Sequence, residues 1–300
     1  KYEVGPAAAL FLRQEIARRL PCFEFERGYP YTHVTTLYFD TRNRDFYRKA
    51  ERSYEDNVKI RVKEYYYPLL VDAHGDRANS SVPGAVEMHG NGTYSPQEAS
   101  YRTSPVCYVE LKQSVAGLVI KKRFGFPKKD LPLLLGGKDV WPILVRITPS
   151  EDLSSLEDVY RELLRYLSCY LGELTSIVCY RRTVYQESEE ELRITFDDHL
   201  AVYPPVPDLY ERAGALTPAV LGKPIRTSDK VILEVKCPGK YPSWLEKAMQ
   251  YHSPRRLSKF TTSVRLILSD SNGSGVRAAV AEESGHKEET IAPEGKKGAG

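Results

Sequence analysis

Hydrophobic and polar residues alternate at every second position in several short segments of the chain. In the clearest of them, Lys59, Arg61 and Lys63 alternate with Ile60 and Val62. Successive side chains of a β-strand point to opposite faces, so the three basic residues share one face and the two aliphatic residues share the other. The pattern therefore predicts strands with one charged and one apolar face.

Period-two and apolar runs predict eight strands, at residues 2–4, 32–39, 57–67, 106–113, 118–124, 175–187, 191–197 and 231–237. Helical periodicity predicts helices at 7–20, 131–135, 154–171, 242–251 and 254–268, and Asp40 and Thr41 are expected to cap a short helical stretch through Tyr47. Residues 201–228 are rich in Pro and Gly and predict a connection without regular structure. These elements predict an α+β fold, an eight-stranded antiparallel β-barrel with flanking helices.

Composition divides the chain into one structured domain and two segments without periodicity. Residues 73–104 are rich in Gly, Ser, Asn, Pro and His and predict a disordered insertion, while residues 269–300 predict a disordered tail. The ordered domain is therefore expected to span residues 1–268. Because the sequence starts without Met in a strand-like run, we expect a fragment, which leaves open a membrane anchor or regulatory domain elsewhere.

Bulk properties exclude several classes of protein. The net charge is only +3 and the five cysteines lack CxxC spacing, which argues against a global nucleic-acid-binding field and against a zinc site. No apolar run approaches the length of about 18 residues that a membrane helix needs. We expect reduced thiols and a cytoplasmic location.

Charged residues recur on further predicted strands, at residues 110–112, 121–123, 193–195 and 234–236. On a single strand such a face is most simply a solvated one. If the sheet closes with its apolar face outward under helices, the charged faces line the lumen. A lumen dense in Lys and Arg with a few carboxylates suits a polyanion and a divalent metal.

Nine short motifs, taken together and in order, resemble the VTC domain, the polyphosphate polymerase branch of the CYTH or triphosphate tunnel metalloenzyme superfamily. The motifs are residues 1–4 (KYEV), 36–41 (TLYFDT), 59–65 (KIRVKEY), 109–112 (VELK), 119–124 (VIKKRF), 180–183 (YRRT), 193–197 (RITFD), 233–236 (LEVK) and 258–260 (SKF). The resemblance extends from residue 1 to about residue 268. It implies an eight-stranded antiparallel tunnel in which the γ-phosphoryl group of ATP is transferred to a growing inorganic polyphosphate chain, with Mn²⁺ or Mg²⁺.

The resemblance implies catalytic roles for Arg61, Arg182, Arg193 and Lys259. It implies substrate contacts for Lys1, Lys59, Lys63, Lys112, Lys121, Arg123, Lys236 and Ser258. An arginine fork grips two phosphate oxygens at once, whereas a lysine supplies a point charge. Parity places Lys121 and Arg123 on one face and Lys122 on the other, and it separates Arg181 from Arg182, without showing which face is the lumen.

Metal binding is expected at Glu234, with Glu110 and Glu3 as weaker candidates. A hard divalent cation prefers carboxylate oxygen, and Glu234 lies between the apolar residues Leu233 and Val235. An ion pair with Lys236 on the same face is the simpler alternative.

Three functions on this scaffold remain open from the sequence. The first is the polymerase. The second is a triphosphatase acting on tripolyphosphate, nucleotides or RNA 5′ ends, and the third is a polyphosphate-binding subunit without catalysis. A nucleic-acid partner is not expected, because exposed aromatic residues interleaved with basic ones are confined to Tyr65, Tyr66 and Tyr67.

Overall fold

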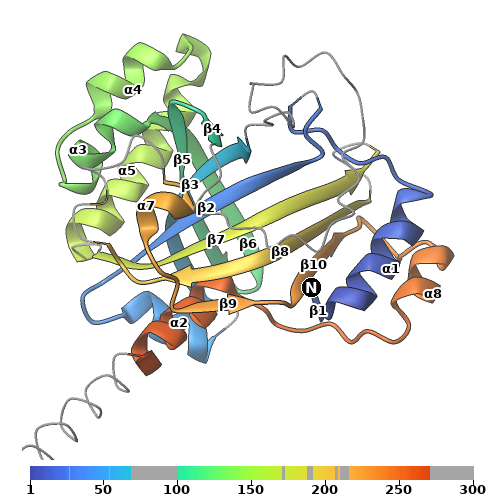
Figure 1. Ribbon diagram of the computed structural model, residues 1–300. Helices are drawn as coiled ribbons and strands as arrows, with labels where there is room; N and C mark the ends of the chain where they lie inside the picture. The colour runs from blue at the N-terminus through green and yellow to red at the C-terminus, as the bar shows by residue number, and fades with distance from the viewer. Residues whose placement is uncertain are drawn as a thin grey trace, which may run out of the picture.

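The computed structural model describes residues 1–26, 28–53, 55–68, 101–170, 173–187, 192–206, 209 and 216–270. They form a mixed α and β fold around one antiparallel sheet (Figure 1). Its strands are β1 (Tyr2–Val4), β2 (Tyr31–Asp40), β3 (Asn57–Pro68), β4 (Tyr101–Thr103), β5 (Val106–Val115), β6 (Leu118–Pro127), β7 (Glu173–Gln186), β8 (Arg193–Tyr203), β9 (Arg226–Ser228) and β10 (Val231–Lys236). The main path runs β1-β10-β8-β7-β2-β3-β5-β6, with β4 paired to β3 and β9 paired to β8.

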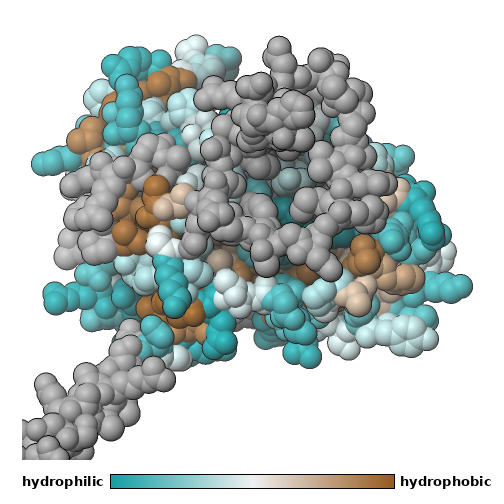
Figure 2. Space-filling model, in the orientation of Figure 1, coloured by the Kyte–Doolittle hydropathy of each residue, from teal (hydrophilic) through white to brown (hydrophobic). Residues whose placement is uncertain are grey.

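Helices lie around the sheet in several groups (Figure 1). They are α1 (Pro6–Ala17), α2 (Asp45–Arg52), α3 (Leu131–Leu135), α4 (Trp141–Ile147), α5 (Leu153–Tyr170), α7 (Pro218–Leu221), α8 (Ser243–Met249) and a C-terminal helix at 259–270. Helices α1 and α8 lie side by side over the β10–β1 end, and α3, α4 and α5 lie at the β5–β6 end. Hydrophilic residues cover most of the described surface in this view, with hydrophobic patches at the α3–α4 end (Figure 2). No helix in the described ranges combines the length and hydrophobicity that crossing a bilayer requires.

The sheet has one apolar and one charged face, as the alternation predicts. Ile60 and Val62 of β3 are 2% and 1% exposed and belong to the hydrophobic core. Leu12 and Ile16 of α1 bury an apolar stripe in a second cluster at the β1–β10 end. The opposite face of the sheet, which carries the charged residues and which we call the inner face, is described below.

Closure of the sheet into a barrel is not confirmed. The paired strands end at β1 on one side and at β6 on the other, and no pairing joins these two strands in the described ranges. The predicted antiparallel sheet with flanking helices is therefore confirmed, whereas the closed eight-stranded tunnel stays a prediction.

Local capping explains where two elements begin. The Asp40 carboxylate accepts hydrogen bonds from the backbone N–H groups of Phe46 and Tyr47 (2.9 and 2.8 Å), which satisfies the first turn of α2. Ser258 Oγ accepts from the N–H of Thr261 (3.3 Å) where the C-terminal helix starts. That helix was expected from residue 254, but residues 254–258 are not helical, and the N–H of Arg255 donates to the carbonyl of Lys1 (2.7 Å).

Other expected boundaries were wrong. Strand β4 lies within the predicted insertion at 73–104, of which residues 73–100 fall outside the described residues, as do residues 271–300 of the predicted tail. Strand β8 continues to Tyr203, because His199 adopts a left-handed backbone (φ 51°) beside a register shift that lets pairing resume. The predicted connection at 201–228 also contains α7 and β9, and α4 was not expected.

Candidate functional site

Strand register brings the predicted basic residues onto one face. Arg61 of β3 lies opposite Glu110 of β5, which lies opposite Arg123 of β6, and the next row in the same register is Lys59, Lys112 and Lys121. Lys122 points to the other face, where its Nζ donates to Glu162 of α5 (2.8 Å). Lys121 and Arg123, rather than Lys122, therefore lie on the charged face, which the sequence alone did not decide.

A buried carboxylate organises the first cluster. Glu110 is fully buried, and Arg61 Nε donates to its Oε2 (2.6 Å) while Lys63 and Lys121 form ion pairs at 3.5 and 3.0 Å. Burial alone would raise the pKa of Glu110, but the charges of Arg61, Lys63 and Lys121 outweigh it and lower that pKa to about 2. Three cations facing one carboxylate leave this cluster with an excess of positive charge.

A second buried carboxylate, Asp197 of β8, organises the next cluster. Arg182 of β7 donates to both of its oxygens at 2.7 Å, and Lys259 from the C-terminal helix donates to Oδ2. Lys259 Nζ also lies 4.5 Å above the ring of Tyr180. Burial opposes the charge of Asp197, but Arg182 and Lys259 hold its pKa well below the usual range.

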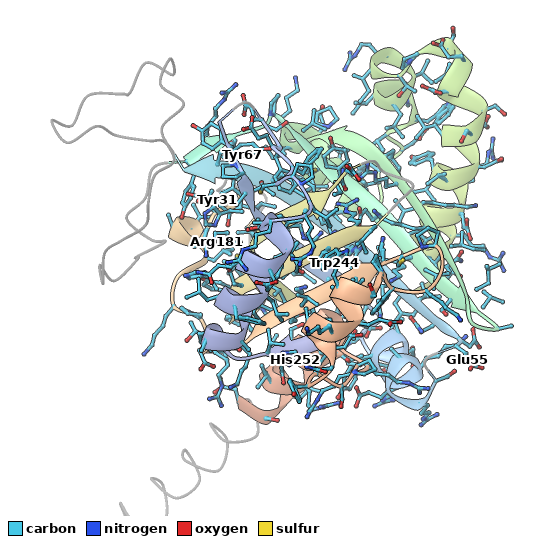
Figure 3. The ribbon with its side chains drawn as sticks, turned by 90° about the vertical axis from the view of Figure 1, so that its right-hand side faces the viewer. Tyr31, Glu55, Tyr67, Arg181, Trp244 and His252 are labelled. Atoms are coloured by element: carbon cyan, nitrogen blue, oxygen red, sulfur yellow. The ribbon has the colours of Figure 1, made fainter. Side chains whose placement is uncertain are left out.

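Arg181, the neighbour of Arg182, points to the opposite face. Its guanidinium donates to Asp198 (2.8 and 2.9 Å), which also accepts a hydrogen bond from Arg13 of α1 (2.7 Å). Figure 3 shows Arg181 and Tyr31 close together at the end of the sheet where α1 packs, and the Arg181 guanidinium lies 5.4 Å from the Tyr31 ring centroid. The Arg181–Asp198 ion pair, together with Arg13, holds helix α1 on the outer face. Of the two neighbouring arginines, Arg182 is therefore the one that joins the inner cluster.

Lysines from both ends of the sheet come close to one another. Burial, then Lys112 and Lys1, lower the pKa of Lys59 to about 8, and burial, Lys1 and Arg61 lower that of Lys112. In a flat sheet β10 and β5 would be roughly 24 Å apart, five strand spacings. Lys236 and Glu234 of β10 nevertheless act on Lys112 of β5, so the sheet is strongly curled around the inner face.

Two predicted residues, Arg193 of β8 and Lys59 of β3, have no ion pair among the described residues. Arg193 lies opposite Lys236 in register and is half-buried. Lys59 Nζ donates to Ser258 Oγ (3.2 Å), just before the C-terminal helix. Arg193 and Lys59 can therefore contact an anionic ligand without first breaking an ion pair.

The candidate metal ligands differ in how firmly cations already hold them. Glu234 is held loosely by Lys1 (3.6 Å), and Glu3 lies on the same face of the adjacent strand β1. Glu110 is already engaged by three cations, which a metal ion would have to displace. The described ranges contain no group of three or more His, Cys, Asp or Glu side chains arranged to hold a metal. Glu234 and Glu3 still fit a Mg²⁺-type site, in which one or two carboxylates combine with substrate phosphates and water.

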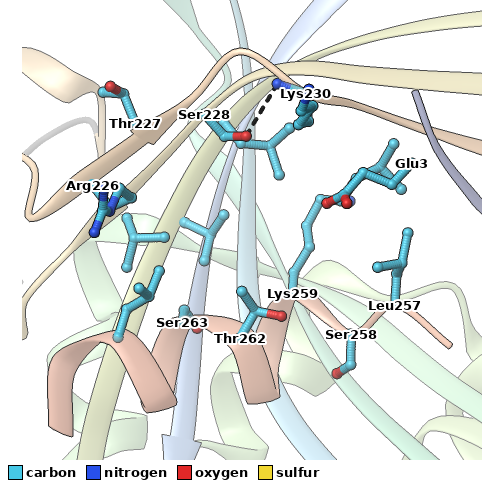
Figure 4. A pocket seen from close by; sticks show the side chains of 15 residues that line it. Glu3, Arg226, Thr227, Ser228, Lys230, Leu257, Ser258, Lys259, Thr262 and Ser263 are labelled. Carbon is cyan, nitrogen blue, oxygen red and sulfur yellow. Dashed lines mark hydrogen bonds between the residues drawn. The ribbon is translucent and has the colours of Figure 1, made fainter. Parts of the chain in front are cut away.

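A cavity continues the inner face toward the C-terminal helix. It lies between β8, β9, β10 and residues 257–266, with an apolar floor that includes Val178 and Val202. Figure 4 shows Lys259 reaching from the helix toward the space beside Glu3. The C-terminal helix therefore closes one end of the inner face, and Ser258 and Lys259 line that end.

Sequence reasoning gave no role to Asp197, Tyr38, Tyr108 and Tyr180. Asp197 lies within the quoted 193–197 motif, four residues after Arg193 and so on the same face, which was the available signal. The tyrosines could not be assigned because an aromatic residue in a strand is more often part of the core.

Comparisons with known proteins identify the family of the chain. A model of the VTC domain family matches residues 1–71 and 94–268. Among curated proteins, none matches. Similar solved structures include a candidate adenylate cyclase from Bacillus halodurans (12% identity, TM-score 0.34, covering 67% of this chain and 73% of that one) and the PH1819 protein of Pyrococcus horikoshii (12% identity, TM-score 0.31, covering 83% of each). These TM-scores are too low to inform function. Since the family match covers most of the sequence, the chain belongs to the VTC domain family.

Proposed function

We propose that the protein is a polyphosphate polymerase, which transfers the γ-phosphoryl group of ATP to the end of a growing inorganic polyphosphate chain. The supporting observation is the excess of cations on the curled inner face. Within the described residues, the acidic side chains on this face are Glu3, Glu110, Asp197 and Glu234, and the basic ones are Lys1, Lys59, Arg61, Lys63, Lys112, Lys121, Arg123, Arg182, Arg193, Lys236 and Lys259. Several of these cations are buried or half-buried, where uncompensated charge is costly, so this face is suited to binding a polyanion.

Phosphoryl transfer depends mainly on positioning and charge neutralisation, which these residues supply. Arg61 and Arg182 are each fixed by a buried carboxylate, so their remaining N–H groups are oriented before substrate arrives. Lys259 and Lys59 add point charges near the end of the inner face that the C-terminal helix closes. The acceptor phosphate is then held in line with the γ-phosphorus.

A divalent ion, Mn²⁺ or Mg²⁺, would be held by the carboxylate of Glu234, with Glu3 on the adjacent strand as the second candidate ligand. When bound there, it would neutralise charge on the phosphate oxygens of ATP. Lys1, which pairs with Glu234 at 3.6 Å, would then be free to contact phosphate.

An assay on the purified chain tests this proposal. ATP and Mn²⁺ are supplied with and without a short polyphosphate primer, and the products are separated on a gel that resolves phosphate chains. We expect a ladder of lengthening polyphosphate, which Glu234→Gln and Arg193→Ala abolish.

The other outcomes identify the alternatives. Free phosphate without a ladder would show a triphosphatase, in which water attacks the γ-phosphorus instead of a phosphate chain. Tight polyphosphate binding with neither product would show a non-catalytic binding subunit. Either result would overturn the polymerase.

The lowered pKa of Lys59 predicts how binding depends on pH. As pH rises through about 8, Lys59 of the free protein loses its proton, so affinity for tripolyphosphate should fall by up to about tenfold per pH unit above that value. Arginine stays charged, so Lys59→Arg should bind with a flatter pH dependence between pH 7 and 9.5, and the remaining dependence should come from Lys63, Lys112 and Lys121, whose pKa values burial also lowers. Calorimetric titrations of both proteins measure this difference, and parallel pH profiles would show that Lys59 does not contact the ligand.

A further inference from the structure

A group of aromatic and basic side chains lies on the inner face just beyond the Glu110 cluster. Tyr65 of β3 and Tyr108 of β5 each follow that cluster by one step on the same face of their strands. Their ring centroids are 5.7 Å apart at 81°, and the Arg123 guanidinium lies 5.3 Å from the Tyr108 ring centroid. Tyr65, Tyr108 and Arg123 form an aromatic and cationic group next to the Glu110 cluster, which we call the rim.

Tyr65 packs against the main hydrophobic core, but core packing does not account for Tyr108 and Arg123. Tyr108 is only half-buried and belongs to neither hydrophobic cluster of the described residues, and Arg123 is exposed. The residue opposite Tyr108 on β6 is Gly125, which places no side chain beside the ring. Among the described residues, the Tyr108 ring is therefore covered on the inner face by the exposed Arg123 side chain rather than by core residues.

We propose that this rim is the nucleobase subsite, in which the base of a nucleoside triphosphate stacks on Tyr108 and is flanked by the Arg123 guanidinium. Aromatic rings and arginine planes are the usual platforms for bases. One same-face step along a strand is about 7 Å, and Lys63 lies opposite Tyr108 in register, so the rim is next to the Arg61 and Lys63 cations. Arg123 is exposed and free to move outward to admit a base.

The subsite rests on the proposed function and adds the direction in which ATP lies along the inner face. With the base at Tyr108, the phosphates extend past Arg61 toward Lys59 and Lys112. Stacking requires only a π-face, so the rim accepts adenine and guanine alike. Inorganic tripolyphosphate, which has no base, does not use the rim.

Calorimetric titration of ATP and of tripolyphosphate into the same proteins tests the subsite. Tyr108→Leu keeps an apolar side chain but removes the ring, and it should weaken ATP binding by about 10- to 100-fold while tripolyphosphate affinity stays unchanged. Tyr108→Phe, the matched control, keeps the ring and should retain the affinity for ATP. Circular dichroism confirms that both variants are folded.

Each other outcome overturns a distinct claim. Unchanged ATP binding by Tyr108→Leu would overturn the base subsite and leave the polymerase intact. Equal loss of ATP and tripolyphosphate would show that Tyr108 supports the phosphate site rather than a base. If wild-type protein bound neither ligand, the proposed function would fail together with the subsite.

Discussion

Alanine at Arg182 is expected to lower the rate of γ-phosphoryl transfer by about 100- to 1,000-fold, the usual loss when one preorganised electrostatic donor is removed. Asp197 fixes the Arg182 guanidinium on the inner face by two hydrogen bonds of 2.7 Å. A shorter side chain cannot reach the phosphates. Transfer from radiolabelled ATP, followed over time, measures the effect.

Arg181→Ala is the matched control, because it removes the same chemistry one residue away. Arg181 pairs with Asp198 on the outer face, beneath α1, so its loss should lower stability without lowering turnover by the folded protein. Equal effects of the two substitutions on turnover, corrected for the folded fraction, would refute the assignment of Arg182 to the site.

Glutamine at Glu110 is expected to lower the free energy of unfolding by about 3–5 kcal/mol, the range seen when one partner of a buried ion pair is removed. Glu110 is fully buried, and its charge compensates Arg61, Lys63 and Lys121. Removing that charge leaves cations of the inner cluster uncompensated. Urea unfolding of wild type and variant at pH 7 measures the loss.

The effect of Glu110→Gln should depend on pH in a defined direction. The folded-state pKa of Glu110, about 2, lies below the unfolded value of about 4.3, so its contribution is complete above that higher value. The contribution is lost as pH falls through about 2. The stability gap between the two proteins should therefore narrow from pH 5 to pH 2, and a gap that stays constant would show that Glu110 is not the titrating group.

Alternation along the strands was sufficient to predict the two-faced sheet. The run from Lys59 to Lys63 gave both the strand and its charged face, since a period of two has only one structural explanation at that length. The β5–β6 hairpin lies where the sequence predicts two consecutive strands, at 106–113 and 118–124, and Ala116 and Gly117 adopt left-handed backbone angles (φ 48° and 81°) at the turn between them.

Features that depend on long-range pairing could not be read from the sequence. Parity separates Arg181 from Arg182, but only the position of helix α1 decides which of them faces outward. Asp197 became recognisable as the partner of Arg182 once β7 and β8 were in register. The length of β8 was underestimated, because the left-handed backbone at His199, which the sequence does not reveal, lets the strand continue beyond residue 197.

The claim that the inner face binds a polyanion is tested most directly by titrating tripolyphosphate into wild type, Arg193→Ala and Arg146→Ala at fixed ionic strength. Both substitutions remove one positive charge, but Arg193 lies on the inner face and Arg146 is exposed on α4. The account predicts one bound ligand per chain, a loss of affinity of about 10- to 100-fold for Arg193→Ala and unchanged binding for Arg146→Ala. Absence of binding, or equal weakening by both substitutions, would contradict it.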